Sequence, residues 1–398
     1  MFEKEKLQGA DIGIEFCGYH LQSPFILSSG PLTYGAEGMI KGHKAGCGAV
    51  VTKTIRRSAA INPVHHMGSV NKDSLINCEK WADSDREQWY TKEISEAVKA
   101  GAIVIASVGH TLGEAMEIVE EVEKAGAHMI ELVSYTEDTL LPMLDYTKAH
   151  VKIPVICKLS GNWPDPVGTA AKCIEHGADG LCAIDSIGPT LKIDIEHACP
   201  EMMSEDGYGW MTGAAMRPIS MRINAEIARN HPDFKNLYAS GGVMEADNAI
   251  EYMMAGAMGA GVCTVGVLKG VEYIEKMCYD LSKRLASLGY DSVAQVNRAA
   301  LKNFPKKEHV SKLNFNFEPY REDGSKKCIG CKKCETVCCY DARKVEFPEM
   351  KLDTTKCRYC GLCLDVCPTK ALTATLAEQT EEDLELERKS IEFKLNTK

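Results

Sequence analysis

Short apolar runs alternate with helical stretches along most of the chain. From residue 24 to residue 289 the alternation repeats eight times, and each run is almost continuously apolar in its middle, which is typical of a parallel strand buried on both faces. Eight such units favour a closed (β/α)8 barrel over an open doubly wound sheet. The expected strands are Pro24–Gly30, Ala49–Ile55, Ile103–Gly109, His128–Ser134, Pro154–Ser160, Gly180–Ser186, Leu237–Gly242 and Gly261–Val265.

The helices between these runs end in a common way. Five of them close on the segments KAGCGAV, KAGAIVI, KAGAHMI, EHGADGL and MAGAMGA. A helix C-cap favours a left-handed residue before the next strand, and glycine adopts that conformation at least cost. The glycines in this place are Gly46, Gly101, Gly126, Gly177 and Gly256. The repeated order of helix, glycine and strand therefore indicates βα units.

Two segments are longer than the connections of such a barrel require. One runs from Arg56 to about Ser84 after the second strand, and the other, Gly188–Ala214, follows the sixth. Both lie at the carboxyl ends of strands, the face on which these barrels build active sites. We expect them to form lids or substrate walls, with insertion without function as the alternative.

Beyond the helix that ends near Gly289 the chain changes character. A polar connection from about Asn303 to Ser325 leads into a Cys-dense segment, Cys328–Pro368, and the last residues are rich in Glu. Domain boundaries fall in such connections. We therefore expect an α/β TIM barrel over residues 1–310, a small α+β domain like a bacterial ferredoxin over residues 311–375, and an acidic helix or tail over residues 376–398.

Cysteine spacing is the strongest chemical signal in the sequence. Two runs follow C-x2-C-x2-C-x3-C, the pattern of ferredoxins with two [4Fe–4S] clusters, in which the fourth cysteine of each run binds the other cluster. Zinc ribbons also use C-x2-C pairs but do not explain two runs of four. Cys339 stands where a proline often follows the fourth ligand, so an exchange of roles between Cys338 and Cys339 stays open. One cluster would take Cys328, Cys331, Cys334 and Cys367, and the other Cys357, Cys360, Cys363 and Cys338.

Composition narrows the class of protein. In a chain of 398 residues whose start, Met1–Asp11, is charged and lacks an apolar leader, 18 cysteines suggest metal ligation in the cytoplasm before disulfides. No apolar run is long enough to span a bilayer, and a net charge of −10 argues against a nucleic-acid partner. Between Gly324 and Lys370, however, ten Lys or Arg stand against six Asp or Glu. This local excess could offset cluster thiolates and dock an acidic redox partner.

A family resemblance adds to this picture. Clusters of this type move single electrons, so the barrel should hold a cofactor, such as flavin, that couples them to a two-electron reaction. The motifs PFILSSGP, VVTKTI, SLINCEKW, VICKLSGN, AIDSIG, TGAAMRP, YASGGV and VCTVG stand in the family's order and spacing. Over roughly residues 11 to 370 the chain resembles the flavin barrel and ferredoxin-like tail of dihydropyrimidine dehydrogenase, including the catalytic subunit of the two-subunit bacterial enzyme. The barrel alone is similar to class 1 dihydroorotate dehydrogenase.

The resemblance implies an FMN site at the carboxyl ends of the strands. Some strand-end residues would run along the flavin, and others would cradle its phosphate through backbone amides after the seventh and eighth strands. Lys158, at the end of the fifth strand, would face the pyrimidine edge, where a cation favours reduced, anionic flavin; a surface salt bridge is the alternative for this lysine. The other implied FMN residues are Ser28, Ser29, Gly30, Lys53, Thr54, Asp185, Gly213, Gly241, Gly242, Cys263 and Thr264.

The sequence departs from the family in the loop after the fourth strand. The family pattern ELNLSCP places an Asn against the substrate and a Cys, or its equivalent, as proton donor or acceptor. Here Val133 replaces the Asn and Thr136 replaces the Cys. Because Thr is a poor acid on its own, proton transfer through Thr136 would need a neighbour or a different residue. The catalytic candidates are therefore Thr136, Glu137 and Lys53.

The substrate site also differs from that of the family. Asn77 keeps the family's amide, but Asp185 stands where the family has Asn on the sixth strand. An unpaired buried polar group costs about 1 to 3 kcal/mol, so the changes disfavour uracil or thymine. A carboxylate only accepts hydrogen bonds, so Asp185 would select an N–H or cationic group, or it pairs with Lys158 or Lys53. The expected substrate-binding residues are Asn77, Asp138, Asp185 and Ser186.

Together these features predict an iron–sulfur flavoprotein oxidoreductase. Electrons would pass between two [4Fe–4S] clusters and FMN, with hydride transfer to or from a CH–CH bond of a small, N-containing cyclic substrate. No Rossmann G-x-G-x-x-G follows a strand, so a flavoprotein subunit that oxidises NAD(P)H, or a ferredoxin, would be the electron partner. The resemblance implies a homodimer, and a hetero-oligomer with the electron partner is also expected. The alternative function is a non-catalytic flavin and iron–sulfur electron-transfer subunit of a larger complex. A third, tRNA dihydrouridine synthesis, is disfavoured by the acidic charge.

Overall fold

The computed structural model describes residues 2–306, 308 and 311–396. The chain divides into two compact units, Met1–Asn303 and Phe304–Lys398. The division falls inside the polar connection, a few residues before the boundary expected at residue 310. Each unit is described by itself.

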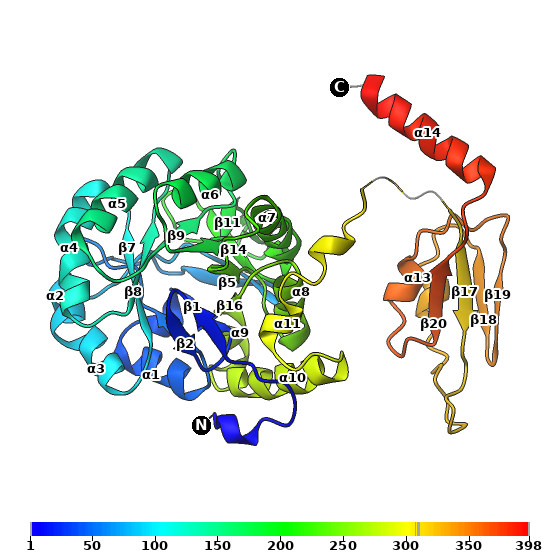
Figure 1. Ribbon diagram of the computed structural model, residues 1–398, viewed down its shortest axis with the longest axis horizontal. Helices are drawn as coiled ribbons and strands as arrows, with labels where there is room; N and C mark the ends of the chain where they lie inside the picture. The colour runs from blue at the N-terminus through cyan, green and yellow to red at the C-terminus, as the bar shows by residue number, and fades with distance from the viewer. Residues whose placement is uncertain (1, 307, 309–310, 397–398) are drawn as a thin grey trace. The chain divides into compact units, whose positions relative to one another are not determined.

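The first unit is a closed barrel of eight parallel strands, as the alternation of apolar runs predicts (Figure 1). The strands neighbour one another in chain order, and the last pairs with the first. Their side chains are almost all buried on both faces, which explains the continuous apolar runs. The strands are β3 (Phe25–Leu27), β4 (Ala49–Val51), β7 (Val104–Gly109), β8 (Met129–Val133), β9 (Val155–Leu159), β10 (Gly180–Ala183), β15 (Leu237–Ser240) and β16 (Gly259–Val262).

Helices surround the barrel strands (Figure 1). In α4, for example, Ala115, Ile118, Val119 and Val122 recur at helical spacing and are fully buried against the barrel, while the Thr111 side chain accepts the Glu114 N–H at the N-cap. The helices are α1 (Ala36–Lys44), α2 (Arg86–Gln88), a π-helical turn (Trp89–Glu93), α3 (Ile94–Lys99), α4 (Leu112–Lys124), α5 (Glu137–His150), α6 (Pro166–Glu175), α7 (Arg217–Asn230), α8 (Ala246–Met254), α9 (Thr264–Lys269), α10 (Tyr273–Ser287) and α11 (Val293–Val296), with 3-10 turns at Lys4–Lys6, Pro31–Thr33, Ala214–Met216 and Leu301–Asn303.

The five glycines expected at helix C-caps have positive φ angles. They are 99° at Gly46, 93° at Gly101, 98° at Gly126, 83° at Gly177 and 112° at Gly256. The prediction is confirmed because the chain must reverse sharply between each of these helices and the next strand, and only glycine does so without a steric penalty.

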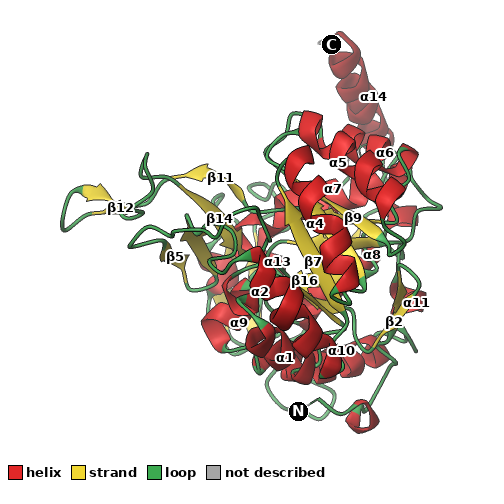
Figure 2. Cartoon of the chain, turned by 90° about the vertical axis from the view of Figure 1, so that its left-hand side faces the viewer, coloured by secondary structure: helices red, strands yellow, loops and turns green. Residues whose placement is uncertain are grey.

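The two long insertions form a second sheet instead of separate loops. Strands β5 (Met67–Asn71) and β6 (Ser74–Asn77) come from the first insertion, and β11 (Ile187–Thr190) and β14 (Gly209–Gly213) from the second. They combine in the order β11-β14-β6-β5, with β6 antiparallel to β14. This sheet extends from the barrel together with the hairpin of β12 (Ile193–Asp194) and β13 (Cys199–Pro200) (Figure 2). The pairing fixes the two insertions to each other.

A short hairpin precedes the barrel. Strands β1 (Ile14–Phe16) and β2 (Tyr19–Leu21) pair antiparallel, and the Phe16 ring contacts the Tyr238 ring edge-on at 5.9 Å between centroids. Both rings are buried. Since Tyr238 lies on β15, this contact joins the hairpin to the barrel interior.

The second unit is small and mixes strands with short helices. Strand β17 (Leu313–Phe317) pairs antiparallel with β20 (Leu372–Leu376), and β18 (Arg343–Glu346) with β19 (Glu349–Leu352). Part of the segment expected to be a connection is therefore a strand of this unit. Its helices are α12 (Lys333–Thr336), α13 (Leu362–Asp365) and α14 (Glu381–Asn396). The fold class is thus a TIM barrel followed by a ferredoxin-like α+β region. In the described residues, every helix is too short or too polar to cross a lipid bilayer.

Candidate active site

A cavity of about 680 Å³ opens at the carboxyl ends of the barrel strands. The second sheet contributes to its wall through Asn77, Trp210 and Thr212. Most of the residues proposed from the sequence for cofactor and substrate lie around this one cavity. They are Ser28, Ser29, Gly30, Lys53, Thr54, Asn77, Lys158, Asp185, Ser186, Gly213, Gly241, Gly242, Cys263 and Thr264.

Three of the proposed residues are not brought to the cavity. Thr136 and Asp138 are exposed at the start of α5, and neither lines the cavity, nor does Glu137. The Thr136 hydroxyl lies 2.9 Å from that of Thr139, and the Glu137 carboxylate accepts a hydrogen bond from Thr169 of α6. These three residues stand at the start of α5, which begins at Glu137, and this places their side chains outside the cavity.

The glycine-rich end of the cavity has the features of an anion cradle. Gly213, Gly241 and Gly242 have φ angles of 88°, 128° and 75°. A Cβ atom at Gly242 would stand 2.7 Å from the Gly213 carbonyl oxygen, so the two loop segments approach too closely for a side chain there. In the part of the chain that the structure describes, the N–H groups of Gly241 and Gly242 have no acceptor in the protein. These free donors, with the first turn of α9, suit the phosphate of a flavin nucleotide.

A second observation at the cavity wall points to a missing polar partner. The Ser28 hydroxyl is buried and has no hydrogen-bond partner among the described residues. Beside it, Gly261 keeps space open, since a Cβ there would lie 2.7 Å from Ser28 Oγ. Buried hydroxyls are normally paired, so Ser28 is suited to receive a hydrogen bond from, or donate one to, a group bound in the cavity.

Two lysines enter the cavity, and each is paired with a carboxylate. Lys53 Nζ lies 2.5 Å from Glu79 Oε2, and both side chains are nearly buried, 10% and 14% exposed. Lys158 Nζ lies 3.1 Å from Asp185 Oδ1. Of the two readings of Asp185 that the sequence allows, the structure therefore shows the ion pair with Lys158. Asp185 Oδ1 also accepts the Ser186 N–H at 2.8 Å, which leaves Oδ2 to the cavity.

A buried acid lies next to the Lys158 pair. Glu131 of β8 is fully buried and accepts a hydrogen bond from the Tyr238 hydroxyl. Burial raises the pKa of Glu131, and Lys158 opposes that rise. Burial also opposes the charge of Lys158, but the carboxylates of Asp185 and Glu131 outweigh it and raise the pKa of the lysine. The floor of the cavity thus keeps a cation at neutral pH.

His110 forms part of the wall at the end of β7. His110 follows Gly109, which pairs with Val133 of β8. The His110 ring packs edge-on against the Tyr135 ring, with 4.0 Å between the ring centroids. Nδ1 is buried without a partner in the described residues. Burial, followed by the charge of Arg56, lowers the pKa of His110 to about 4. The imidazole is therefore neutral at physiological pH and offers both a donor and an acceptor.

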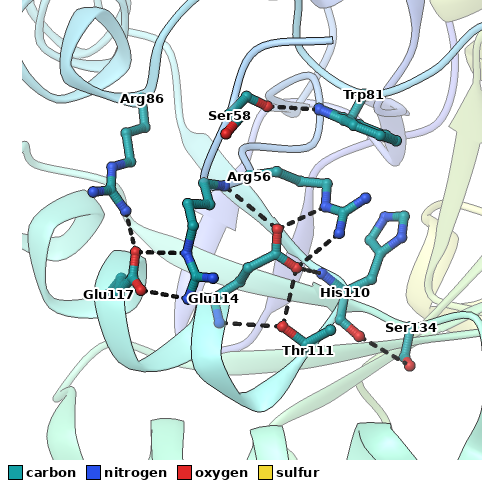
Figure 3. Close-up of polar contacts among 10 residues, drawn as sticks. Arg56, Ser58, Trp81, Arg86, His110, Thr111, Glu114, Glu117 and Ser134 are labelled. Atoms are coloured by element: carbon teal, nitrogen blue, oxygen red, sulfur yellow. Dashed lines mark hydrogen bonds and ion pairs between the residues drawn. The ribbon is translucent and has the colours of Figure 1, made fainter.

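An ion-pair network fixes this wall (Figure 3). The Glu114 carboxylate accepts the backbone N–H of His110 at 2.6 Å and pairs with Arg56 through two hydrogen bonds of 2.8 and 3.0 Å. The Arg56 guanidinium lies over the Trp81 ring at 4.2 Å, and the Trp81 indole N–H donates to the Ser58 carbonyl at 2.7 Å. Trp81 and His110 both line the cavity, so Arg56 and Glu114 set the shape of one side of it.

The sequence reasoning missed Glu79, Trp81, His110 and Tyr135. A signal for two of them was present. His110 directly follows a predicted strand, and Glu79 stands two residues after Asn77 in the SLINCEKW motif. Residues at the carboxyl end of a barrel strand enter the mouth by geometry, whatever their type.

In the second unit, the two cysteine runs have matching backbones. Positive φ angles occur at Gly330, Lys332 and Asp341 in the first run and at Tyr359, Gly361 and Lys370 in the second. Each residue of the second set stands at the equivalent place in its C-x2-C-x2-C-x3-C run. Four of these six are not glycine, and left-handed backbone is costly for such residues. A repeated, costly loop shape is what two equivalent cluster sites require.

Contacts among the cysteines connect the two runs. Cys334 of the first run and Cys367 of the second are close enough for their charges to interact. Burial opposes ionisation of Cys367, but the N–H groups of Leu372 and Thr369, with the Thr369 hydroxyl, lower the pKa of its thiol. Among the described residues, no group of three or more His, Cys, Asp and Glu side chains surrounds a single-ion site.

Comparisons with known proteins agree with this architecture. Residues 12–285 match the family model described as dihydroorotate dehydrogenase, and residues 350–373 match a 4Fe–4S binding domain. The chain is 27% identical to the NAD-dependent dihydropyrimidine dehydrogenase subunit PreA of Escherichia coli K12 over 393 residues, covering 90% of this chain and 94% of the relative. It is 28% identical to the dihydroorotate dehydrogenase B (NAD(+)) catalytic subunit of Methanothermobacter thermautotrophicus over 302 residues, 70% of this chain and 95% of the relative.

The barrel match covers more than half of the chain, and the cavity lies inside it. The iron–sulfur match falls in the second unit. The chain therefore belongs to the dihydroorotate dehydrogenase family, as an iron–sulfur oxidoreductase that acts on CH–CH bonds.

Proposed function

We propose that the chain binds FMN in the barrel and two [4Fe–4S] clusters in the second unit. It would couple them to hydrogenation or dehydrogenation of a small cyclic, nitrogen-containing substrate. The observation that carries the proposal is the cavity that brings free glycine amides, an orphaned serine hydroxyl and two lysines together at one end of the barrel. When bound there, FMN would supply exchange of hydride with the substrate and of single electrons with the clusters.

We assign the following residues of the cavity to FMN. Gly241 and Gly242 offer backbone N–H groups to the phosphate, and Ser28 offers its hydroxyl to the flavin. Lys158, kept cationic by its carboxylate neighbours, would favour the anionic form of the ring system. Cys263 is a neutral thiol here, because burial raises its pKa to about 11.

The substrate would meet a polar wall made by several elements. Asn77 of β6 donates to the Trp210 carbonyl at 3.3 Å, which orients its amide oxygen as a free acceptor. His110 offers a neutral imidazole, and Asp185 offers one carboxylate oxygen. This mixture of acceptors and amphoteric groups suits a heterocycle with N–H and C=O groups. The relatives are named for dihydropyrimidine and dihydroorotate, which carry such groups.

The proton of the reaction would come from the Lys53 and Glu79 pair. Lys53 was one of three catalytic candidates from the sequence, and it is the one that lines the cavity. Its ammonium contacts Glu79 at the cavity, with both side chains nearly buried, so Nζ is placed to donate to a bound molecule. Thr136 and Glu137, outside the cavity, are left out of the proposal.

The electron partner would be a separate protein. We propose a flavoprotein subunit that oxidises NAD(P)H, or a ferredoxin, since the relative PreA is named as a subunit of an NAD-dependent enzyme. The excess of Lys and Arg between residues 324 and 370 would favour an acidic docking surface on that partner. A homodimer, or a hetero-oligomer with this partner, remains the expected assembly.

The alternative function, an electron-transfer subunit without substrate chemistry, is favoured by one observation. Val133 and an exposed Thr136 replace the amide and the acid that the family resemblance places after the fourth strand. The two functions give different results in one experiment. Anaerobic protein is reduced with dithionite and mixed with a panel of cyclic imides, enoates and N-heterocycles. Rapid reoxidation of the flavin by one member supports the enzyme, and no reoxidation by any member supports the carrier.

A further inference from the structure

The second unit buries a cation that lacks a protein counter-charge. Arg343, the first residue of β18, is 4% exposed. Its Nη1 lies 3.2 Å from Met350 Sδ, and its guanidinium carbon stands 4.5 Å from the centre of the Phe315 ring. Its Nη2 is buried without a hydrogen-bond partner, and no carboxylate pairs with it in the described part of the chain. A buried charge in such surroundings is costly unless an anion balances it.

Strand β18 packs against α12, which carries Cys334, and the Val345 N–H donates to the Glu335 carboxylate of that helix at 2.9 Å. Helix α12 in turn packs against α13, which carries Cys363, so the strand that bears Arg343 and the two cysteines belong to one packed group of elements. Cys334 and Cys363 are the third cysteines of the two runs, so this group includes both halves of the module. Four thiolates give each [4Fe–4S] site a net negative charge, and reduction adds another electron.

The two halves of the module differ at this place. In the second run the residue equivalent to Arg343 is Leu372, which is 2% exposed. The backbones around the two runs match, so the arginine occupies a position where the repeat accepts an apolar side chain. Because Leu372 fills the equivalent position, packing does not require a cation at residue 343. We therefore look for an electrostatic role of the Arg343 guanidinium.

We propose that Arg343 is the charge-balancing residue of the iron–sulfur module, and that its guanidinium raises the reduction potential of the clusters on both sides of it. The inference rests on the proposed presence of clusters in both cysteine runs. A fixed cation stabilises the reduced cluster more than the oxidised one, because the reduced cluster carries more negative charge. Donation from the free Nη2 to a cluster or cysteine sulfur adds to the same effect.

The test is a spectroelectrochemical titration of the anaerobic full-length protein, followed by EPR. In Arg343→Gln, the reduction equilibrium constant of at least one cluster should fall tenfold or more, which is about 59 mV for a one-electron couple. Arg343→Lys keeps the charge and should remain within threefold of the wild type. Lys344→Gln, which removes an exposed charge from the next residue of the same strand, is the matched control and should shift the constant less than threefold.

The outcomes separate this inference from the proposed function. Wild-type protein without iron and acid-labile sulfide would refute both. Clusters at unchanged potentials in Arg343→Gln would overturn only the role of Arg343. If Arg343→Gln assembles no cluster, iron content in Arg343→Lys decides: recovery supports a requirement for charge, and loss in both variants overturns it.

Discussion

Lys158 is the residue on which the electrostatics of the barrel mouth depend. It is buried between two carboxylates, Asp185 at 3.1 Å and Glu131 on the neighbouring strand. Removing one member of a buried ion pair leaves the other charge uncompensated. This lowers the stability of the fold more than replacing both members with apolar residues does.

Lys158→Met should therefore destabilise the barrel by about 3 kcal/mol, a value at the lower end for buried pairs because the Asp185 side chain is 38% exposed. Thermal unfolding followed by circular dichroism measures the loss. The double variant Lys158→Met with Asp185→Asn should recover part of it. A single variant as stable as the wild type would contradict the assignment of Lys158 as the cation of this cluster.

His110 gives the protein a pH dependence of definite sign. Burial and Arg56 hold its pKa near 4, against about 6.5 in an unfolded chain. Glu114 and Asp185 act in the opposite direction, and Lys158 acts with Arg56. A lowered histidine pKa means that the unfolded state binds the proton first, so stability is complete above pH 6.5 and is lost as the pH falls toward 4.

Between pH 7.5 and pH 5 this single group should cost roughly 2 kcal/mol of unfolding free energy. His110→Asn removes the titrating group. Between the same two pH values its unfolding free energy should therefore fall less than that of the wild type, by the amount that the histidine contributes. Urea unfolding at the two pH values measures the difference. Equal losses in the two proteins would mean that the imidazole is already solvated or charged.

At the level of single residues, sequence patterns identified which residues gather at the site better than they assigned a role to each residue. The cysteine runs and the strand-end glycines are defined by spacing along the chain, so a sequence pattern identifies them, and their roles as ligands stay predictions. The side-chain position of Thr136 depends on the residue at which α5 begins, and the local sequence pattern does not predict that residue. Glu79 and His110 were signalled only by their places after a motif and a predicted strand, since their residue types do not indicate that they reach the cavity.

At the level of elements, the barrel strands were predictable because burial on both faces leaves a continuous apolar signal. The eighth strand was expected at Gly261–Val265 and occurs at Gly259–Val262, since Thr264 already begins α9. The second sheet was not predicted at all. It joins β6 to β14, which are more than a hundred residues apart, and such pairing is invisible to short-range periodicity.

The loop after β15 carries the most direct prediction for cofactor binding. Gly242→Ala forces a Cβ into a backbone with φ of 75° and to 2.7 Å from the Gly213 oxygen. FMN affinity, measured by quenching of flavin fluorescence, should fall at least tenfold, or about 1.4 kcal/mol. Gly289→Ala is the control, since its φ is 83° but no atom lies within 4 Å of the added Cβ. Equal affinity in Gly242→Ala and the control would place the phosphate elsewhere.

At the scale of the whole molecule, the chain combines two units with different electron chemistry. The barrel offers a site for a two-electron cofactor, and the cysteine module offers sites for one-electron centres. Their joint presence in one chain was predictable from the sequence, because each unit has its own signature. The substrate was not, because the side chains that line the cavity come from many elements, among them Asn77, Glu79, His110 and Asp185.

We propose that one chain holds one FMN and two [4Fe–4S] clusters. Anaerobic titration with dithionite, followed by flavin and cluster absorbance, counts its electron capacity. The account predicts about four electron equivalents per chain, two for the flavin and one for each cluster. Uptake of about two equivalents with bleaching of flavin alone, or no uptake at all, would contradict it.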